Sequence, residues 1–379
     1  MGSVLPFITG AIWLSVLGRF IWPLSCGIGT KIVLALITLL AAEYHWFVAR
    51  FFGSLASPEL PRGVLIGVGW AFGVVLLLSL LLLLRDVVGG LTWLLSRSAG
   101  WAVLTGRPLH LSLGILALVL STFGTWQAIR VPDVKDLELT LPGLPQAFDG
   151  YRIVQLTDLH ASRLLEQPWM AAVVAKTNAL DPDLIVITGD LADGTPAARA
   201  ADVQPLHDLK ARDGVLAIPG NHEYYADYLG WMHAYRALGL DMLENAHVVI
   251  RRGDAALAVA GTTDRQAGPF GQLRPDLGAA LKGLEPGVPV ILLAHRPEGA
   301  AQHAQAGVAL QLSGHTHGGQ ILGPNLLTKW ANEGFVSGLY HVGSMLLYVS
   351  NGTGLWNGLA LRVGVPSEIT RIVLRSPRH

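Results

Sequence analysis

Long uninterrupted apolar runs occupy the first third of the chain. Val64–Leu84 ("VLIGVGWAFGVVLLLSLLLLL") holds roughly 20 residues without a charge, which is the length that crosses a bilayer core of ~30 Å. Leu109–Ile129 is similar, and it places Trp126 where an interfacial aromatic side chain would lie. Ile32–Val48 is a third apolar run of this kind. These patterns predict membrane-spanning helices.

The run Leu5–Leu24 is a fourth candidate span, interrupted by Arg19 and Pro23. A cleaved signal peptide is the alternative, but no basic segment precedes the run and more apolar spans follow it. The pattern therefore predicts an N-terminal bundle of about four transmembrane helices over residues 1–130, in a multi-pass membrane protein. Arg85–Arg107 is too broken by glycine, serine and arginine to cross, and we expect its segment "LTWLLSRSAGWAVL" to lie along the membrane interface. Basic residues are almost equally numerous in the loops on the two sides, so the side of the C-terminal part stays open.

The pattern changes at Val131. The stretch "VPDVKDLELTLPGLP" is charged and punctuated by proline, so residues 131–150 are expected to form a linker and a first strand. Short β-branched runs such as "YRIVQLTD", "DLIVITGD" and "VPVILLAHR" then recur, as expected of strands buried on both faces. Helix-like stretches, among them Gln167–Leu180 and Ala226–Leu238, lie between some of them. This alternation predicts an α/β layered domain over residues 151–379.

The composition agrees with this division. Of the 379 residues, 51% are hydrophobic and only 14% are charged, against about 25% charged in a soluble globular protein. The formal net charge is zero, so no nucleic-acid partner is expected, because such a partner calls for a clustered basic surface. The single cysteine, Cys26, excludes an intrachain disulfide and a thiolate metal cluster.

Polar clusters directly follow the predicted buried strands. Their members carry carboxylate, imidazole or carboxamide groups, and they are Asp158 and His160, Asp190, then Asn221, His222 and Glu223, then His295, and finally His315 and His317. Ligands bind at the carboxyl ends of strands in α/β folds. A set of nitrogen and oxygen donors without cysteine suits divalent metals such as Mn, Fe or Zn.

The spacing of these residues adds to the argument. Asp158 and His160, like His315 and His317, are two positions apart, which puts both side chains on one side of an extended backbone. Asp190 comes from a separate strand and could bridge two ions ~3.5–4 Å apart. Each cluster alone has an ordinary interpretation as a helix cap, a turn or a core histidine. Five such clusters in succession after buried strands favour one dinuclear metal site.

The order DxH, GD, GNHE, H and GHTH resembles the calcineurin-like metallophosphoesterase superfamily, over about Tyr151 to Leu374. The flanking words "FDGYRIVQLTDLH", "GNHEYY" and "LQLSGHTHGGQ" are similar to its bacterial membrane-associated, YkuE-like branch. The resemblance implies a four-layer α/β-β/α sandwich with metals at the strand ends. The sequence departs from that branch at "LWNGLALR", which contains no proline.

The resemblance also implies two divalent metal ions and a role for each matching residue. One ion would be held by Asp158, His160, Asp190 and His317, and the other by Asp190, Asn221, His295 and His315. His222 would not be a ligand; with Asn221 it would bind the phosphate, and it would protonate the leaving group as a general acid. Tyr224, Tyr225 and Arg296 adjoin these positions and either line the phosphate pocket or pack behind it.

The expected function is that of a membrane-anchored, metal-dependent phosphoesterase. It would hydrolyse a phosphomonoester, phosphodiester or pyrophosphate by in-line attack of a metal-bridging hydroxide, with manganese among the candidate metals. The membrane anchor makes a lipid or lipid-linked nucleotide an attractive substrate.

Other functions are less well supported. A non-catalytic scaffold or regulatory module of the same fold is disfavoured because all seven ligand positions are filled. A transporter would need intramembrane charges, and only Arg19 and Glu43 qualify, both near span ends. The zero net charge and the membrane anchor disfavour a nuclease.

Overall fold

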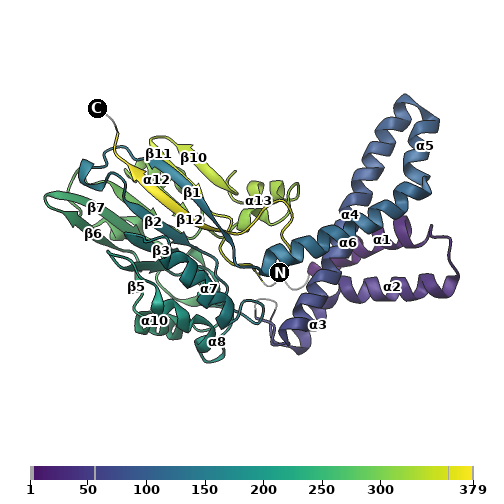
Figure 1. The fold of residues 1–379 in the computed structure, drawn as a ribbon, viewed down its shortest axis with the longest axis horizontal. Helices are drawn as coiled ribbons and strands as arrows, with labels where there is room; N and C mark the ends of the chain where they lie inside the picture. The colour runs from purple at the N-terminus through teal and green to yellow at the C-terminus, as the bar shows by residue number, and fades with distance from the viewer. Residues whose placement is uncertain (1–3, 55–56, 357, 378–379) are drawn as a thin grey trace. The chain divides into compact units, whose positions relative to one another are not determined.

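The computed structural model describes residues 4–54, 57–356 and 358–377 (Figure 1). The chain forms two compact units, the first made of residues 1–128 with 357–363 and the second of residues 129–356 with 364–379. No sequence pattern predicted a place for residues 357–363 in the first unit. There the Arg362 backbone N–H donates to the Gly124 carbonyl at 3.0 Å, and the Gly358 carbonyl lies 2.7 Å from His45 Nε2.

The first unit is helical. Its elements are α1 (Leu5–Val16) with a π-helical turn (Leu17–Ile21), α2 (Ile28–Ala42), α3 (Tyr44–Phe51), α4 (Arg62–Leu95), α5 (Arg97–Thr105) and α6 (Arg107–Ile129). By length and composition, α4 and α6 can cross a membrane, and α2 with α3 counts as a third span if their 51° bend is one broken helix. The first apolar run forms a helix only over Leu5–Ile21 and is too short. The described residues thus contain two or three candidate spans where about four were expected.

Helix α4 runs past the predicted end of its span at Leu84. Arg85 and Asp86 lie within the helix, where their side chains pair with each other at 2.7 Å. Helix α5 then folds back on α4. A Cβ at Gly100 would lie 2.3 Å from the Trp93 Cα, so this close approach of the two helices requires glycine.

The second unit contains two mixed six-stranded sheets. The first has the order β1 (Asp133–Thr140), β12 (Glu368–Arg375), β2 (Arg152–Leu156), β3 (Leu184–Thr188), β4 (Val215–Ile218) and β5 (Asp241–Met242). The second has the order β10 (Gly338–Val342), β11 (Met345–Val349), β9 (Leu310–Ser313), β8 (Val290–Leu293), β7 (Ala255–Gly261) and β6 (Ala246–Arg252). Strands β2 to β5 run parallel to one another, as do β7, β8, β9 and β11.

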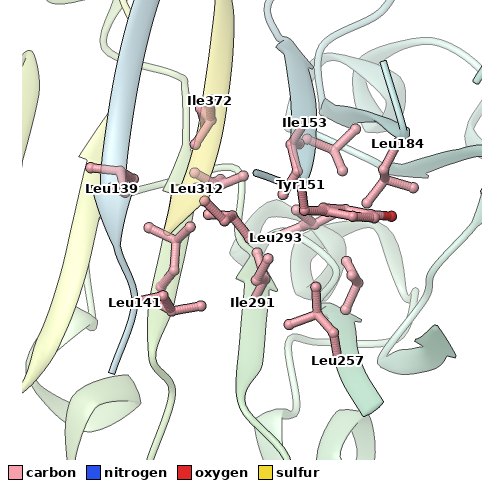
Figure 2. Close-up of a cluster of buried hydrophobic side chains, with 14 of the residues drawn as sticks. Leu139, Leu141, Tyr151, Ile153, Leu184, Leu257, Ile291, Leu293, Leu312 and Ile372 are labelled. Carbon is pink, nitrogen blue, oxygen red and sulfur yellow. The ribbon is translucent and has the colours of Figure 1, made fainter. Parts of the chain in front are cut away.

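The two sheets face each other across a hydrophobic core. Ile153 and Leu184 of the first sheet belong to the same buried cluster as Leu293 and Leu312 of the second (Figure 2). Because both faces of the central strands are covered, their sequences read as continuous apolar runs rather than alternating ones.

Helices form the outer layers. On the first sheet's side lie α7 (Gln167–Asn178), α8 (Pro196–Val203) and α10 (Tyr228–Ala237), as Figure 1 shows. A second buried cluster joins β7, β8 and β11 to α11 (Leu277–Leu281) and α12 (Ala300–Gln305). The short helices α9 (His222–Tyr225) and α13 (Asn325–Ala331) follow β4 and β9 along the chain. The four-layer α/β-β/α sandwich is confirmed.

Candidate metal centre

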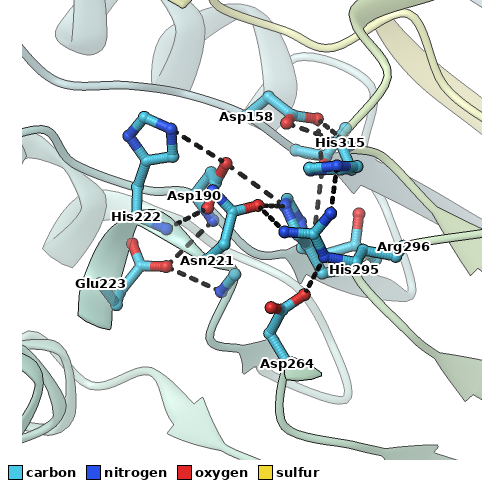
Figure 3. Close-up of polar contacts among 12 residues, drawn as sticks. Asp158, Asp190, Asn221, His222, Glu223, Asp264, His295, Arg296 and His315 are labelled. Carbon is cyan, nitrogen blue, oxygen red and sulfur yellow. Dashed lines mark hydrogen bonds and ion pairs between the residues drawn. The ribbon is translucent and has the colours of Figure 1, made fainter. Parts of the chain in front are cut away.

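Five parallel strands, β2, β3, β4, β8 and β9, each lead within three residues to a candidate metal ligand. In chain order these ligands are Asp158, Asp190, Asn221, His295 and His315. The carboxyl ends of parallel strands meet at one edge of a sheet, and the core joins the two sheets, so these side chains converge (Figure 3).

The first group of donors consists of Asp158, His160 and His317. Their ligand atoms all lie within 4.8 Å of one another, and all three residues are buried. The two imidazole Nε2 atoms are 3.1 Å apart, and Asp158 Oδ1 is 3.4 Å from His317 Nε2. Asp190 Oδ2 lies 3.7 Å from His160 Nε2 and borders the same space.

The second group consists of Asp190, His295 and His315, whose ligand atoms also lie within 4.8 Å of one another. His295 Nε2 is 3.2 Å from Asp190 Oδ2 and 3.1 Å from Asn221 Oδ1. The structure thus brings all seven predicted ligands into two adjoining groups, with Asp190 between them.

The hydrogen bonds of two histidines fit metal binding. His160 Nδ1 lies 3.0 Å from Asp193 Oδ1, and His295 Nδ1 lies 2.8 Å from the Thr188 carbonyl oxygen. Since both partners are acceptors, each Nδ1 carries the proton, and each Nε2 faces the donor group as the coordinating atom. The donor set therefore fits two divalent ions that accept nitrogen and oxygen ligands.

The backbone of the candidate ligands is strained. Five of them have positive φ angles although they are not glycine, namely Asp158 (52°), His160 (46°), Asp190 (53°), His315 (68°) and His317 (50°). Each such conformation costs on the order of 1–3 kcal/mol and persists where the surrounding structure enforces it, most often at functional sites. The i, i+2 argument from an extended backbone was therefore incomplete, because both pairs lie on left-handed turns.

Two glycines allow the carboxylates to come close to neighbouring backbone. A Cβ at Gly220 would lie 2.2 Å from Asp190 Oδ1, and one at Gly314 would lie 2.3 Å from Asp158 Oδ2. Any side chain at either position would displace a candidate ligand.

Asp193 is a site residue that the sequence reasoning missed. Its Oδ1 lies 3.0 Å from His160 Nδ1 and 2.6 Å from His222 Nδ1, and the side chain is buried. One carboxylate thus orients both a candidate ligand and the candidate general acid. The available signal was the second aspartate of "GDLAD", three residues after Asp190.

Glu223 holds the ligand loops in place. Its carboxylate accepts backbone N–H groups from Gly220 at 2.7 Å, Asp190 at 3.1 Å and Leu191 at 2.8 Å, and the Tyr235 hydroxyl at 3.2 Å. The last acidic residue of "GNHE" therefore fixes the loops after β3 and β4 rather than facing a ligand.

The sequence left open whether Tyr224, Tyr225 and Arg296 line the site or pack behind it. The Arg296 guanidinium donates to Asp264 Oδ2 at 2.8 Å and to Asn221 Oδ1 at 3.0 Å, and it contacts His315 Nε2. The Tyr225 hydroxyl accepts from Asn221 Nδ2 at 3.3 Å. Tyr224 instead is buried and stacks on another tyrosine. Arg296 and Tyr225 border the site, and Tyr224 packs behind it.

Neighbouring charges raise the pKa values of two histidines in the cluster and lower the pKa of one carboxyl group. Burial alone would lower the pKa of His222 and His295, but Asp190 and the other nearby carboxylates outweigh it and raise these pKa values to about 9 and about 10. Burial would raise the pKa of Asp193, but the charges of His160 and His222 hold it at about 2. Protons on the histidines therefore balance the buried carboxylates when no ion does so.

Asp158 and His315 behave differently. Burial raises the pKa of Asp158, against the opposing charges of the histidines. Burial also lowers the pKa of His315 well below its usual range, and the positive charges of His295 and Arg296 lower it further. His315 is therefore a neutral imidazole at neutral pH, the form that coordinates a metal.

Residues 151–319 match the family described as calcineurin-like phosphoesterase. The chain is 36% identical over 294 residues to the "transmembrane protein with metallophosphoesterase domain" of Danio rerio, covering 74% of this chain and 66% of that protein. It is 34% identical over 275 residues to the metallophosphoesterase Cj0846 of Campylobacter jejuni, covering 71% and 70%. It is 35% identical over 243 residues to the metallophosphoesterase YkuE of Bacillus subtilis, covering 62% and 82%.

The chain thus spans slightly less than two thirds of the fish protein's length and more of the bacterial ones. Its domain carries the buried histidine and aspartate cluster that a phosphoesterase of this kind uses to hold metal. The chain belongs to the calcineurin-like metallophosphoesterase superfamily.

Proposed function

We propose that this protein is a membrane-anchored, dinuclear metal-dependent phosphoesterase of the YkuE-like branch. The observation that supports it most is the convergence of four imidazoles, two carboxylates and one carboxamide at the ends of five strands. Two candidate spans in α4 and α6, and the relative named as a transmembrane protein, support the membrane anchor.

The two donor groups would each hold one divalent ion. Asp158, His160, Asp190 and His317 would hold the first, and Asp190 with Asn221, His295 and His315 the second. Bound there, such ions would supply Lewis-acid activation of water and would neutralise charge on the phosphate, the chemistry that in-line displacement at phosphorus requires. Nitrogen and oxygen donors of this kind suit Mn, Fe or Zn.

His222 would act as the general acid. Its Nδ1 proton is donated to Asp193 at 2.6 Å, which leaves Nε2 to present a second proton to the leaving oxygen. In the metal-free protein, burial would lower the pKa of His222, but Asp190 and Asp193 outweigh it and raise this pKa to about 9, so there the ring carries both protons at neutral pH. As the bond between phosphorus and the leaving oxygen breaks, that oxygen takes the Nε2 proton, and the Nδ1 proton stays on the hydrogen bond to Asp193.

The substrate class follows from the membrane anchor. We propose a phosphomonoester, phosphodiester or pyrophosphate carried by a lipid or a lipid-linked nucleotide. Arg296 and Asn221 would bind its non-bridging phosphate oxygens, because a guanidinium held by Asp264 at 2.8 Å presents its remaining N–H groups to the site.

The test compares Asp190→Asn with wild type in hydrolysis of an aryl phosphomonoester and an aryl phosphodiester with added Mn²⁺. Asp254→Asn, an exposed aspartate in the turn between β6 and β7, is the matched control. Bound metal is quantified in all three purified proteins. We expect Asp190→Asn to lose metal and to lower turnover at least 100-fold, because Asp190 borders both donor groups.

Equal turnover in wild type and Asp190→Asn would refute the proposal. Metal binding by wild type without turnover of any lipid or aryl phosphoester would instead favour a non-catalytic scaffold of the same fold.

A further inference from the structure

A cavity of about 480 Å³ lies among the helices of the first unit, and the metal-ligand cluster contributes nothing to it. Three arginines line it, Arg19, Arg85 and Arg107, together with His110. The His110 ring stacks on Phe20 at 4.5 Å, and its Nε2 lies 3.0 Å from the Phe20 carbonyl oxygen, so this wall is fixed in place.

The positive charge of the cavity is only partly compensated. Asp86 accepts from Arg85 Nη2 at 2.7 Å and from Arg19 Nε at 2.7 Å. Among the described residues, no carboxylate lies within ion-pair distance of Arg107, which is exposed. Three guanidinium groups therefore share one carboxylate, which leaves a formal charge of +2.

Only one of the three guanidinium groups is buried, since the Arg19 side chain is 47% exposed and Arg107 is exposed. The Arg85 side chain is only 8% exposed. A buried arginine needs anionic or hydrogen-bonding partners, and Asp86 alone satisfies Arg85 while it also pairs with Arg19. A second anion bound in the cavity would pair with the guanidinium charge that Asp86 does not neutralise.

The arginines lie at the end of the apolar stretches. Arg85 follows Arg62 by roughly six turns of α4, a rise of about 35 Å, and α6 runs a similar length from Arg107 to Ile129. A bilayer core is ~30 Å thick, so a bilayer that α4 crosses between Arg62 and Arg85 would have the cavity at the level of its headgroups. The cavity is at the end of α6 away from its junction with the second unit's first strand.

An apolar stripe begins at the cavity. Leu111 both lines it and is 42% exposed, and Ile115 and Leu118 follow at helical spacing with 63% and 44% exposure. An acyl chain whose headgroup occupied the cavity could lie along this stripe.

We propose that the cavity binds the phosphate headgroup of an anionic membrane lipid. Arginine fits phosphate because its planar guanidinium presents paired N–H donors, and basic pockets between membrane helices recognise anionic headgroups. This site lies in a different unit from the proposed catalytic centre and does not depend on the proposed function.

The experiment uses the full chain in a non-ionic detergent with EDTA, so that hydrolysis cannot consume the probe. Binding of a fluorescent short-chain phosphatidic acid is titrated, with the phosphatidylcholine analogue as the neutral probe. The variants are Arg107→Gln, which removes the unpaired guanidinium, and Arg97→Gln, which removes an exposed arginine of α5 outside the cavity. Inorganic phosphate at roughly 10 mM tests a free ion as the ligand.

We expect wild type and Arg97→Gln to bind phosphatidic acid alike, and Arg107→Gln to bind it at least tenfold more weakly, since a charge-assisted hydrogen bond is lost. Phosphatidylcholine should bind weakly to all three proteins, and inorganic phosphate should not displace the lipid. Equal affinity of wild type and Arg107→Gln, or an equal loss in Arg97→Gln, would overturn the proposal. Full displacement by inorganic phosphate would overturn the lipid as ligand and identify a free-phosphate site.

Discussion

Replacing Asp193 by asparagine tests whether one buried carboxylate controls both metal binding and proton donation. The substitution preserves shape and one acceptor oxygen but removes the negative charge that faces His160 Nδ1 at 3.0 Å and His222 Nδ1 at 2.6 Å. Burial would raise the pKa of Asp193, yet these histidines hold it at about 2 rather than 3.8. That difference corresponds to roughly 2.5 kcal/mol of favourable interaction in the metal-free protein.

The sign of this contribution with pH follows from the direction of the shift. Because the folded-state pKa of Asp193 is depressed, its contribution to stability is present above about pH 4 and is lost as the pH falls through about 2. The pKa of His222 is raised to about 9, so its contribution is complete below about pH 6.5 and is lost as the pH rises through 9. The stability deficit of Asp193→Asn should therefore be largest between about pH 4 and 6.5.

The assay measures kcat of an aryl phosphoester against pH at saturating Mn²⁺, with bound metal quantified. We expect kcat to fall about 10- to 100-fold and its basic limb to move to lower pH, because His222 loses an anionic partner. Asp254→Asn, an exposed aspartate far from the cluster in sequence, should leave both unchanged. An Asp193→Asn variant with wild-type kcat and an unmoved basic limb would refute this reasoning.

Other changes probe the support of the site. Glu223→Gln should lower the free energy of unfolding of the metal-free protein by about 2–4 kcal/mol in denaturant titrations, because an NH₂ group would face backbone N–H donors; an unchanged midpoint would contradict this. Arg296→Ala should raise KM about tenfold with a smaller effect on kcat, whereas Arg265→Ala, whose side chain is 63% exposed, should change neither. Metal uptake should release protons, and metal affinity should increase from about pH 6 to 9. Burial would lower the pKa of His295, but the charge of Asp190 outweighs burial and raises this pKa to about 10, so metal must displace a proton from His295. Calorimetry in buffers of different ionisation enthalpy measures that release.

The strands were predictable where burial leaves a recognisable apolar run in the sequence. Strands covered on both faces read as continuous apolar runs, and "DLIVITGD" forms β3 (Leu184–Thr188) as expected. The helix boundaries in the first unit were less predictable, because the charges at Arg85 and Asp86 indicated the end of a span, whereas α4 continues through them to Leu95. The place of residues 357–363 depends on tertiary contacts such as that between Gly358 and His45, which no local pattern encodes.

The members of the site were predictable because each follows a buried strand, but their supports were not. Asp193 and Glu223 act in large part through hydrogen bonds to residues 29 to 33 positions away in the chain, such as that from Leu191 N–H to Glu223. Arg296 depends on Asp264, which belongs to a different loop. A ligand can be recognised by its type and its place after a strand, whereas a supporting residue is defined only by the partner that the fold brings to it.

Charge balance explains why the supports are needed. Asp158, Asp190 and Asp193 are buried within one cluster, and buried carboxylates are costly unless cations compensate them. Without ions, protons on His222 and His295 supply that compensation, which is why the pKa values of both histidines are raised despite burial. Divalent ions would replace the proton on the ligand His295, while Asp193, which is not a candidate ligand, would still accept from His222 Nδ1. Asp193, which His160 and His222 share, is therefore the carboxylate that stays available to hold the His222 proton when metal takes the place of the proton on His295.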